Sequence, residues 1–172
     1  MKLTFWGAAQ QVTGSMHLVE LESGTKILID CGLDYENRKE FEDKNATFPF
    51  KASDIDLLIL THAHIDHSGN LPTLIKHGFS GSIYATPATR DLCAIMLMDS
   101  AMIQMKDAEH LLKYRDEHVE PLYDIDDVAN TMQLFDPMPY HHSFSALDIL
   151  HEEQLVELSV LQLCIPSRYQ EH

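Results

Sequence analysis

Three histidines and one aspartate lie within six consecutive residues, beginning at His62. In an extended segment, side chains two positions apart point to the same side, so His62 and His64 can present both imidazoles to one pocket. If the chain turns after Ile65, then Asp66 and His67 can lie beside the same pocket and serve a second cation. Mixed nitrogen and oxygen ligation suits Zn²⁺. The spacing therefore predicts metal ligation by His62, His64, Asp66 and His67.

Hydrolysis is the reaction that such a site favours. Two metal ions roughly 3.5–4 Å apart lower the pKa of a bridging water and hold the oxygens of a scissile phosphate or carbonyl. Asp66 is the expected catalytic carboxylate, because it can bind metal and also position the water. Asp30 is a second candidate, since a carboxylate behind the ligands can orient them. A purely structural role for Asp30, capping a turn at a strand end, is an equal alternative.

The isolated histidines have no such neighbours, and an ordinary place on the polar surface is expected for four of them. These are His17, His77, His110 and His118.

Composition indicates one ordinary globular domain, because 45% of the 172 residues are hydrophobic and 23% are charged. The formal net charge of −15 repels phosphates, so binding of a nucleic acid would need a local basic surface, bound cations or another domain. Three widely spaced cysteines are typical of reduced intracellular thiols. The chain shows neither a signal peptide nor a membrane span of about 18 apolar residues, which favours a cytoplasmic protein.

Alternating short strands and helices predict an α/β fold. Apolar stretches between glycine turns indicate strands over residues 2–6, 18–22, 26–29, 55–60 and 82–86. Helices are expected over residues 70–77, 88–118 and 125–134, while residues 34–50 look like an excursion over the surface. Pro137 and Pro139 should then break the pattern. In this arrangement Asp30 sits at a strand end, and the strand over 55–60 delivers the chain into the histidine loop.

The histidine loop, together with four other segments, resembles the RNA-processing β-CASP branch of the metallo-β-lactamase superfamily. The segments that carry the resemblance are residues 3–7, 12–15, 29–33, 60–72 and 86–89, and Asp99 and Ser100 continue it. The resemblance implies an αββα-type fold, of which residues 1–144 would be the incomplete N-terminal part. It also implies that Asp30 belongs to the first family motif. The second motif, which holds two zinc ions, would be His62, His64, Asp66 and His67.

The resemblance ends at about residue 144. The further strand, the glycine-histidine motif, the bridging aspartate and the inserted β-CASP domain of the family are not found after it, so His151 and His172 receive no metal role. Residues 145–172 are either the divergent end of a genuine short protein or the product of a truncated or frameshifted gene. The second explanation is preferred, because interpretable periodicity is lost at the same point. The apolar run there favours a helix over a strand.

Family members cleave RNA as endonucleases, as 5′-to-3′ exonucleases, or both. The sequence therefore predicts a metal-dependent hydrolase derived from such a ribonuclease, impaired in this short chain and with weak affinity for RNA on its own. Two alternatives remain open: a thioester or lactone hydrolase of the same fold, and a non-catalytic zinc-binding remnant.

Overall fold

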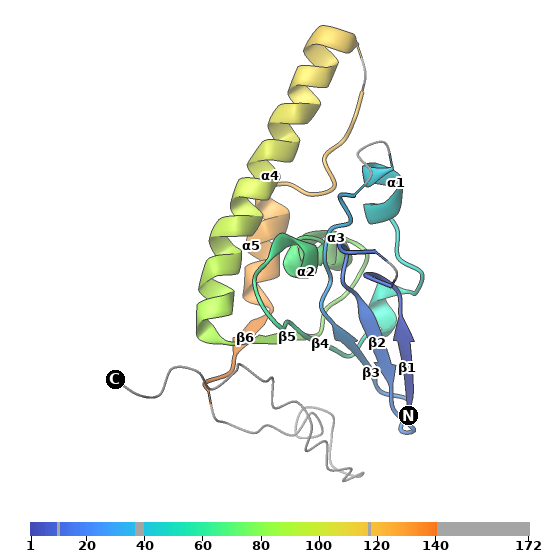
Figure 1. Cartoon of the computed structure of the whole chain (residues 1–172). Helices are drawn as coiled ribbons and strands as arrows, with labels where there is room; N and C mark the ends of the chain where they lie inside the picture. The colour runs from blue at the N-terminus through green and yellow to red at the C-terminus, as the bar shows by residue number, and fades with distance from the viewer. Residues whose placement is uncertain (10, 37–39, 117, 141–172) are drawn as a thin grey trace, which may run out of the picture. The chain divides into compact units, whose positions relative to one another are not determined.

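The computed structural model describes residues 1–9, 11–36, 40–116 and 118–140. Residues Met1–Met138 form one compact unit built on a six-stranded sheet, which is the α/β architecture that the sequence predicts (Figure 1). The strands lie side by side in chain order: β1 (Lys2–Phe5), β2 (His17–Glu20), β3 (Lys26–Ile29), β4 (Leu57–Ile59), β5 (Ser82–Ala85) and β6 (Phe135–Pro137).

The strand directions change at β3. The hairpins make β1, β2 and β3 antiparallel, whereas β3, β4, β5 and β6 are parallel because helices connect them. These connections contain α1 (Phe41–Asn45), the 3-10 helix η1 (Ala52–Asp54), α2 (Ile65–Ser68), α3 (Leu71–Lys76), α4 (Pro87–Arg115) and α5 (Ile125–Gln133). Parallel strands bring their carboxyl ends to one edge, where ligands of α/β sheets bind. The loops that follow β3 and β4 therefore meet at that edge.

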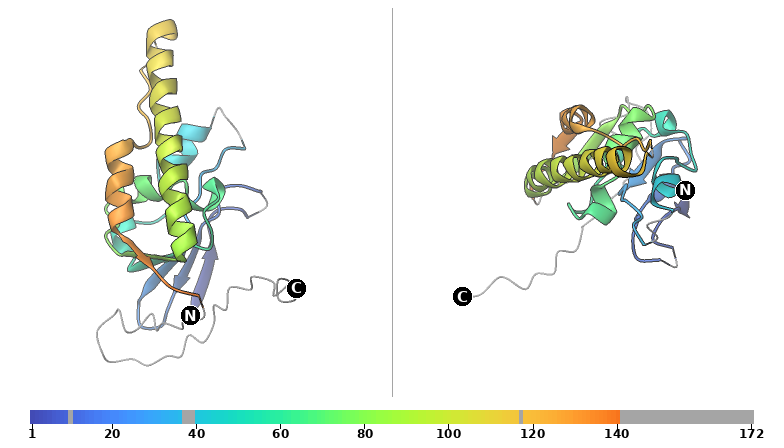
Figure 2. Two further views of the ribbon diagram at one scale, coloured as in Figure 1. Left: turned by 90° about the vertical axis from the view of Figure 1, so that its left-hand side faces the viewer. Right: turned by 90° about the horizontal axis from the view of Figure 1, so that it is seen from above.

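The main core lies between one face of the sheet and the helices. Strand register places Leu28, Leu58 and Ile83 next to one another, and all three are fully buried. Leu97 of α4 and Val128 of α5 belong to the same apolar cluster. The two helices lie side by side over this face (Figure 2). A layer of helices thus holds the parallel strands, and through them the edge that carries the histidine loop.

Helix α4 begins one residue before the expected start of the helix over residues 88–118 and ends three residues before its expected end. The Thr86 side chain accepts a hydrogen bond from the Thr89 N–H at 3.2 Å, and Pro87 occupies the first turn, where its missing N–H costs nothing. Asp116 ends the helix in a left-handed conformation. None of the helices among the described residues is long and apolar enough to cross a membrane.

Two features were not expected. The described residues of 34–50 lie mostly at the surface, as expected, but they also contain α1 and the buried Asn45, whose side chain bonds the backbone of Asp34 in both directions at 2.8 Å. The helical pattern ends before Pro137, as expected, but the chain then forms β6, which pairs with β5 and ends at Pro137. The expected domain boundary at residue 144 and the expected helical tail over 145–172 lie outside the described residues.

Candidate metal centre

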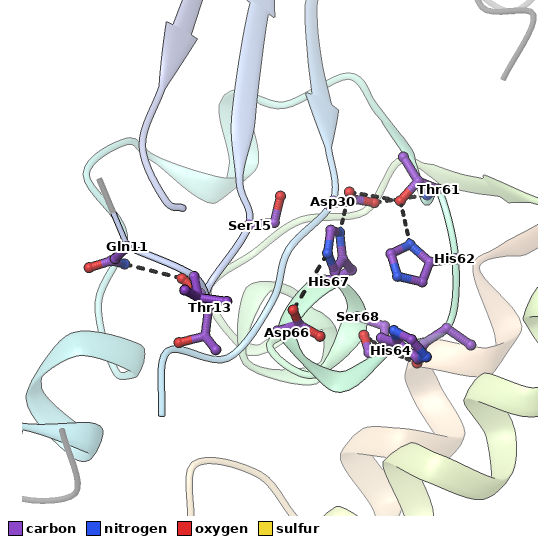
Figure 3. A network of polar contacts seen from close by, with 12 residues as sticks. Gln11, Thr13, Ser15, Asp30, Thr61, His62, His64, Asp66, His67 and Ser68 are labelled. Carbon is purple, nitrogen blue, oxygen red and sulfur yellow. Dashed lines mark hydrogen bonds and ion pairs between the residues drawn. The ribbon is translucent and has the colours of Figure 1, made fainter. Parts of the chain in front are cut away.

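The chain passes from β4 into an extended stretch and then directly into the single turn of α2. His64 precedes that turn, and His67 lies within it. The ring centroids of His62 and His64 are 4.7 Å apart, and those of His62 and His67 are 4.1 Å apart. Asp66 Oδ2 lies 3.6 Å from His67 Nε2. The four predicted ligands are therefore gathered in one place (Figure 3).

Asp30 lies behind these histidines and is only 3% exposed. Its Oδ1 accepts the Thr61 N–H at 2.8 Å, and its Oδ2 accepts the Thr61 hydroxyl at 2.9 Å. His67 Nδ1 lies 2.8 Å from the same Oδ2. Asp30 also has a left-handed backbone, with φ of 61°. Of the two roles that the sequence left open, orientation of the ligands is the one that these contacts support.

The network around Asp30 fixes which nitrogen of two histidines carries the proton. A carboxylate has no hydrogen to give, so His67 Nδ1 must be the donor to Asp30. Because the Thr61 hydroxyl gives its only hydrogen to Asp30, its oxygen accepts from His62 Nδ1, which is 2.9 Å away. In their neutral form both rings then have an unprotonated Nε2, and that of His67 lies 3.6 Å from Asp66 Oδ2. This is the arrangement by which outer carboxylates prepare histidines for metal.

The electrostatic surroundings favour the neutral form of His62. Burial lowers its pKa below the usual value, and His67 and His64 lower it further. Neutral imidazole is the form that binds metal. The three neighbouring rings therefore favour binding of a metal cation over protonation of His62.

The backbone of α2 is held by two other segments of the chain. A helix of one turn leaves its carbonyl groups without intrahelical partners. Here Leu33 N–H bonds the Ile65 carbonyl at 3.1 Å, Ser15 N–H bonds that of Asp66 at 2.8 Å, and Cys31 N–H bonds that of His67 at 2.8 Å. Every residue from 65 to 67 is thus fixed from outside the loop.

Gly32 lies against the same turn with no room for a side chain. A Cβ atom built on Gly32 would lie 1.6 Å from the Asp66 carbonyl oxygen and 2.7 Å from the His67 nitrogen. The Gly32 N–H also bonds the Ser15 carbonyl at 3.0 Å. Glycine is therefore required here by close backbone approach.

In the described part of the chain, no three His, Cys, Asp or Glu side chains are arranged to hold a metal ion as they stand. The donor chemistry nevertheless fits zinc, because three clustered imidazoles and the Asp66 carboxylate are its usual ligand types.

Some residues of this centre were not anticipated from the sequence. Thr61 joins Asp30 to His62, and Ser15 and Gly32 hold the turn, but none of them has a side chain that signals metal chemistry. The expected surface role is wrong for His17, which is half-buried, packs edge-on against Phe5, and has a buried Nδ1 with no partner. The other three isolated histidines that were assigned to the surface are exposed.

The chain is similar to known proteins over most of its length. Residues 10–150 match the family model described as "Metallo-beta-lactamase superfamily". Ribonuclease TTHA0252 of Thermus thermophilus is 38% identical over 140 residues, which are 81% of this chain and 28% of that protein. Transcription termination factor FttA of Methanocaldococcus jannaschii is 35% identical over 117 residues, which are 64% of this chain and 17% of that protein.

The chain thus spans less than a third of the length of these relatives. The names of these relatives agree with the resemblance to an RNA-processing branch. Among solved structures, human tRNase Z, short form, is 23% identical, with a TM-score of 0.39 over 58% of this chain and 40% of that one.

Proposed function

The chain belongs to the metallo-β-lactamase superfamily, and on that premise we propose that it is the zinc-binding part of a hydrolase of RNA. One observation supports the zinc site above all others. Asp30 orients His67 directly and His62 through Thr61, so that in their neutral form both rings have an unprotonated Nε2. A purely structural network would have no need to leave both Nε2 atoms unprotonated.

In this proposal two zinc ions are held by His62, His64, Asp66 and His67. Bound zinc supplies a water of lowered pKa and a positive charge for the oxygens of a phosphodiester. Asp66 would have the catalytic role, because its carboxylate lies among the ligands and could also position that water. Asp30 is buried behind the rings, so it is a positioning residue rather than a catalytic one in the strict sense.

RNA is the proposed substrate because the relatives are a ribonuclease and transcription termination factors. The net charge of −15 offers phosphates no general attraction. We therefore propose that this chain alone binds RNA weakly and cleaves it slowly or not at all.

The free and buried Cys31 and Cys93 fit a cytoplasmic setting, where thiols stay reduced. Residues 1–144 would be the family part and 145–172 a divergent tail.

Zinc content tests the metal site. After dialysis, the purified chain should retain zinc, and the double variant His62→Ala, His64→Ala should lose it. The control is His77→Ala combined with His110→Ala, since both side chains are exposed and lie outside the cluster. Equal zinc in the wild type and the first double variant would contradict the assignment.

Substrate assays test the reaction separately from the metal. Single-stranded RNA, a thioester and a lactone are offered to the zinc-loaded chain, with Asp66→Asn as the inactive control. Slow RNA cleavage that Asp66→Asn abolishes supports the proposal, and so does zinc binding without any cleavage. Fast RNA cleavage would refute the proposal that this chain alone cleaves RNA slowly or not at all. Turnover of the thioester or lactone alone would favour the small-molecule alternative.

A further inference from the structure

A groove of about 1050 Å³ lies between the middle of α4 and the segments opposite it. One wall is α4 with the segment that returns from it, and the other is α1 with the loop after β3. Figure 1 shows α1 standing across from the middle of α4. The groove is outside the histidine cluster, and its apolar lining comes from Leu33, Phe41, Ile65, Met96, Ile103 and Leu111.

The α4 wall carries apolar and acidic side chains on one face. Met96, Ile103 and Leu111 line the groove at spacings of two helical turns, and Asp99 and Asp107 line it between them. From Met96 to Leu111 the helix rises roughly 22 Å, which is about the length of a four-turn helix. Ile103 is 52% exposed, so this face is available for contact.

The groove carries an excess of negative charge. Four carboxylates line it, against one arginine, Arg115. The four are Glu42, Asp99, Asp107 and Glu120. Among the contacts of the described residues, none of these four side chains takes part in a hydrogen bond or an ion pair, so their charges are not neutralised within this part of the chain. Such a surface repels the phosphates of RNA and attracts cationic groups.

We propose that this groove is a docking site for a basic amphipathic helix of a partner protein. Its apolar side chains fit the apolar face of such a helix, and the unpaired carboxylates interspersed among them fit lysine and arginine side chains that flank that face. The groove extends to Leu33 and Ile65, whose backbones bond to each other at 3.1 Å at the base of the metal turn. A docked helix would therefore contact Leu33 and Ile65, which lie at the base of the metal turn, without occupying the metal centre itself.

Binding is measured by fluorescence anisotropy with designed peptides and the full chain. The probe is an amphipathic peptide of about 15 residues, the length of the α4 wall, with leucines on one face and lysines on the other. A second peptide has glutamate in place of every lysine. The lysine peptide should bind, more weakly as salt is raised, and the glutamate peptide should not. Equal binding of both peptides, or of neither, would overturn the proposal.

Charge variants locate the binding. Neutralising three groove carboxylates, by Asp99→Asn, Asp107→Asn and Glu120→Gln, should weaken the lysine peptide about tenfold or more. This change leaves the apolar side chains of the groove intact, and thermal unfolding verifies that the fold is kept.

The matched control removes the same charge from the exposed surface outside the groove, by Asp91→Asn, Glu109→Gln and Asp126→Asn. It should leave affinity within about twofold. Equal weakening by both triple variants would mean general attraction to an acidic protein, and would refute a site in the groove.

The apolar contribution has its own pair of variants on the same helix. Ile103→Asn should weaken the peptide, whereas Ile95→Asn should not, because Ile95 is 69% exposed and lies outside the groove. A single-stranded RNA that competes with the lysine peptide for wild type but not for the groove triple variant would instead identify the groove as an RNA channel and overturn the proposal.

Discussion

The histidine turn is held by many contacts, whereas the outer end of α4, its last turn with Leu112 and Tyr114, is held by few. In the turn, three successive carbonyls accept N–H groups from elsewhere in the chain, and Gly32 packs against the backbone with no space left. At the outer end of α4, Leu112 is 43% exposed and Tyr114 is 65% exposed. Chemistry requires geometry fixed by supporting contacts, whereas an exposed helix end makes few such contacts. Mutations should therefore act strongly in the first region and weakly in the second.

The strongest test of this contrast is Gly32→Ala. The added methyl would overlap the Asp66 carbonyl, which is backbone and cannot swing away. We expect a loss of about 3 kcal/mol or more in the free energy of unfolding, as for other overpacked sites, together with loss of zinc from any folded fraction. Chemical denaturation and zinc analysis measure the two effects.

Gly24→Ala is the control for the glycine substitution itself. Gly24 has a left-handed φ of 93°, but a Cβ there would meet nothing within 4 Å. The expected cost is about 1–2 kcal/mol, from conformation alone, with zinc binding unchanged. If Gly32→Ala is no more costly than Gly24→Ala, the turn is not rigidly held and the contrast fails.

The next effect in size is on zinc affinity, by Asp30→Asn. An amide at this position cannot accept from both Thr61 and His67 as the carboxylate does, so the proton positions on His62 and His67 are no longer fixed. Replacing such an outer partner typically weakens metal binding by about 10–100-fold. Competition with a coloured chelator measures the affinity of the folded protein.

Asp34→Asn is the matched control, because Asp34 is also buried and does not touch the histidines. Its carboxylate accepts hydrogen bonds from the Gln11 side-chain amide and the Glu36 backbone N–H. It should lower stability without changing the zinc affinity of the folded protein. Equal zinc affinity in Asp30→Asn and the wild type would show that Asp30 only caps its turn.

The sequence predicted the parts of this site that depend on local signals. An apolar run followed at once by His62 and His64 is sufficient to place the histidine loop after a strand. The helix expected over residues 88–118 likewise corresponds to α4, whose first turn holds Pro87. Asp30 was placed at a strand end for the same reason, although its contacts with Thr61 and His67 could not be foreseen from residues more than thirty positions away.

The parts that were missed depend on tertiary contacts. A four-residue helix such as α2 is too short to show a period, and its carbonyls are satisfied by distant N–H groups. Proline is a poor signal for a strand, yet among the described residues β6 is the last strand of the sheet, an edge position that tolerates Pro137. The burial of Asn45 arises from bonds to Asp34 that no local pattern encodes.

The smallest expected effect is at the outer end of α4, by Leu112→Ala and Tyr114→Ala. Both side chains are exposed and lie outside the groove, and the ring of Tyr114 lies against His110, at 4.6 Å between centroids, and Lys113 of its own helix. Each change should shift the free energy of unfolding by no more than about 0.5 kcal/mol. Leu97→Ala, on the same helix but fully buried, should cost about 2–5 kcal/mol, because it leaves a cavity in the core. Thermal or denaturant unfolding of the three variants measures this gradient along α4.

A cost of more than about 1 kcal/mol for Tyr114→Ala would mean that the outer end of α4 is covered in solution. The contrast with the histidine turn would then not hold, because both regions would be parts of one packed structure.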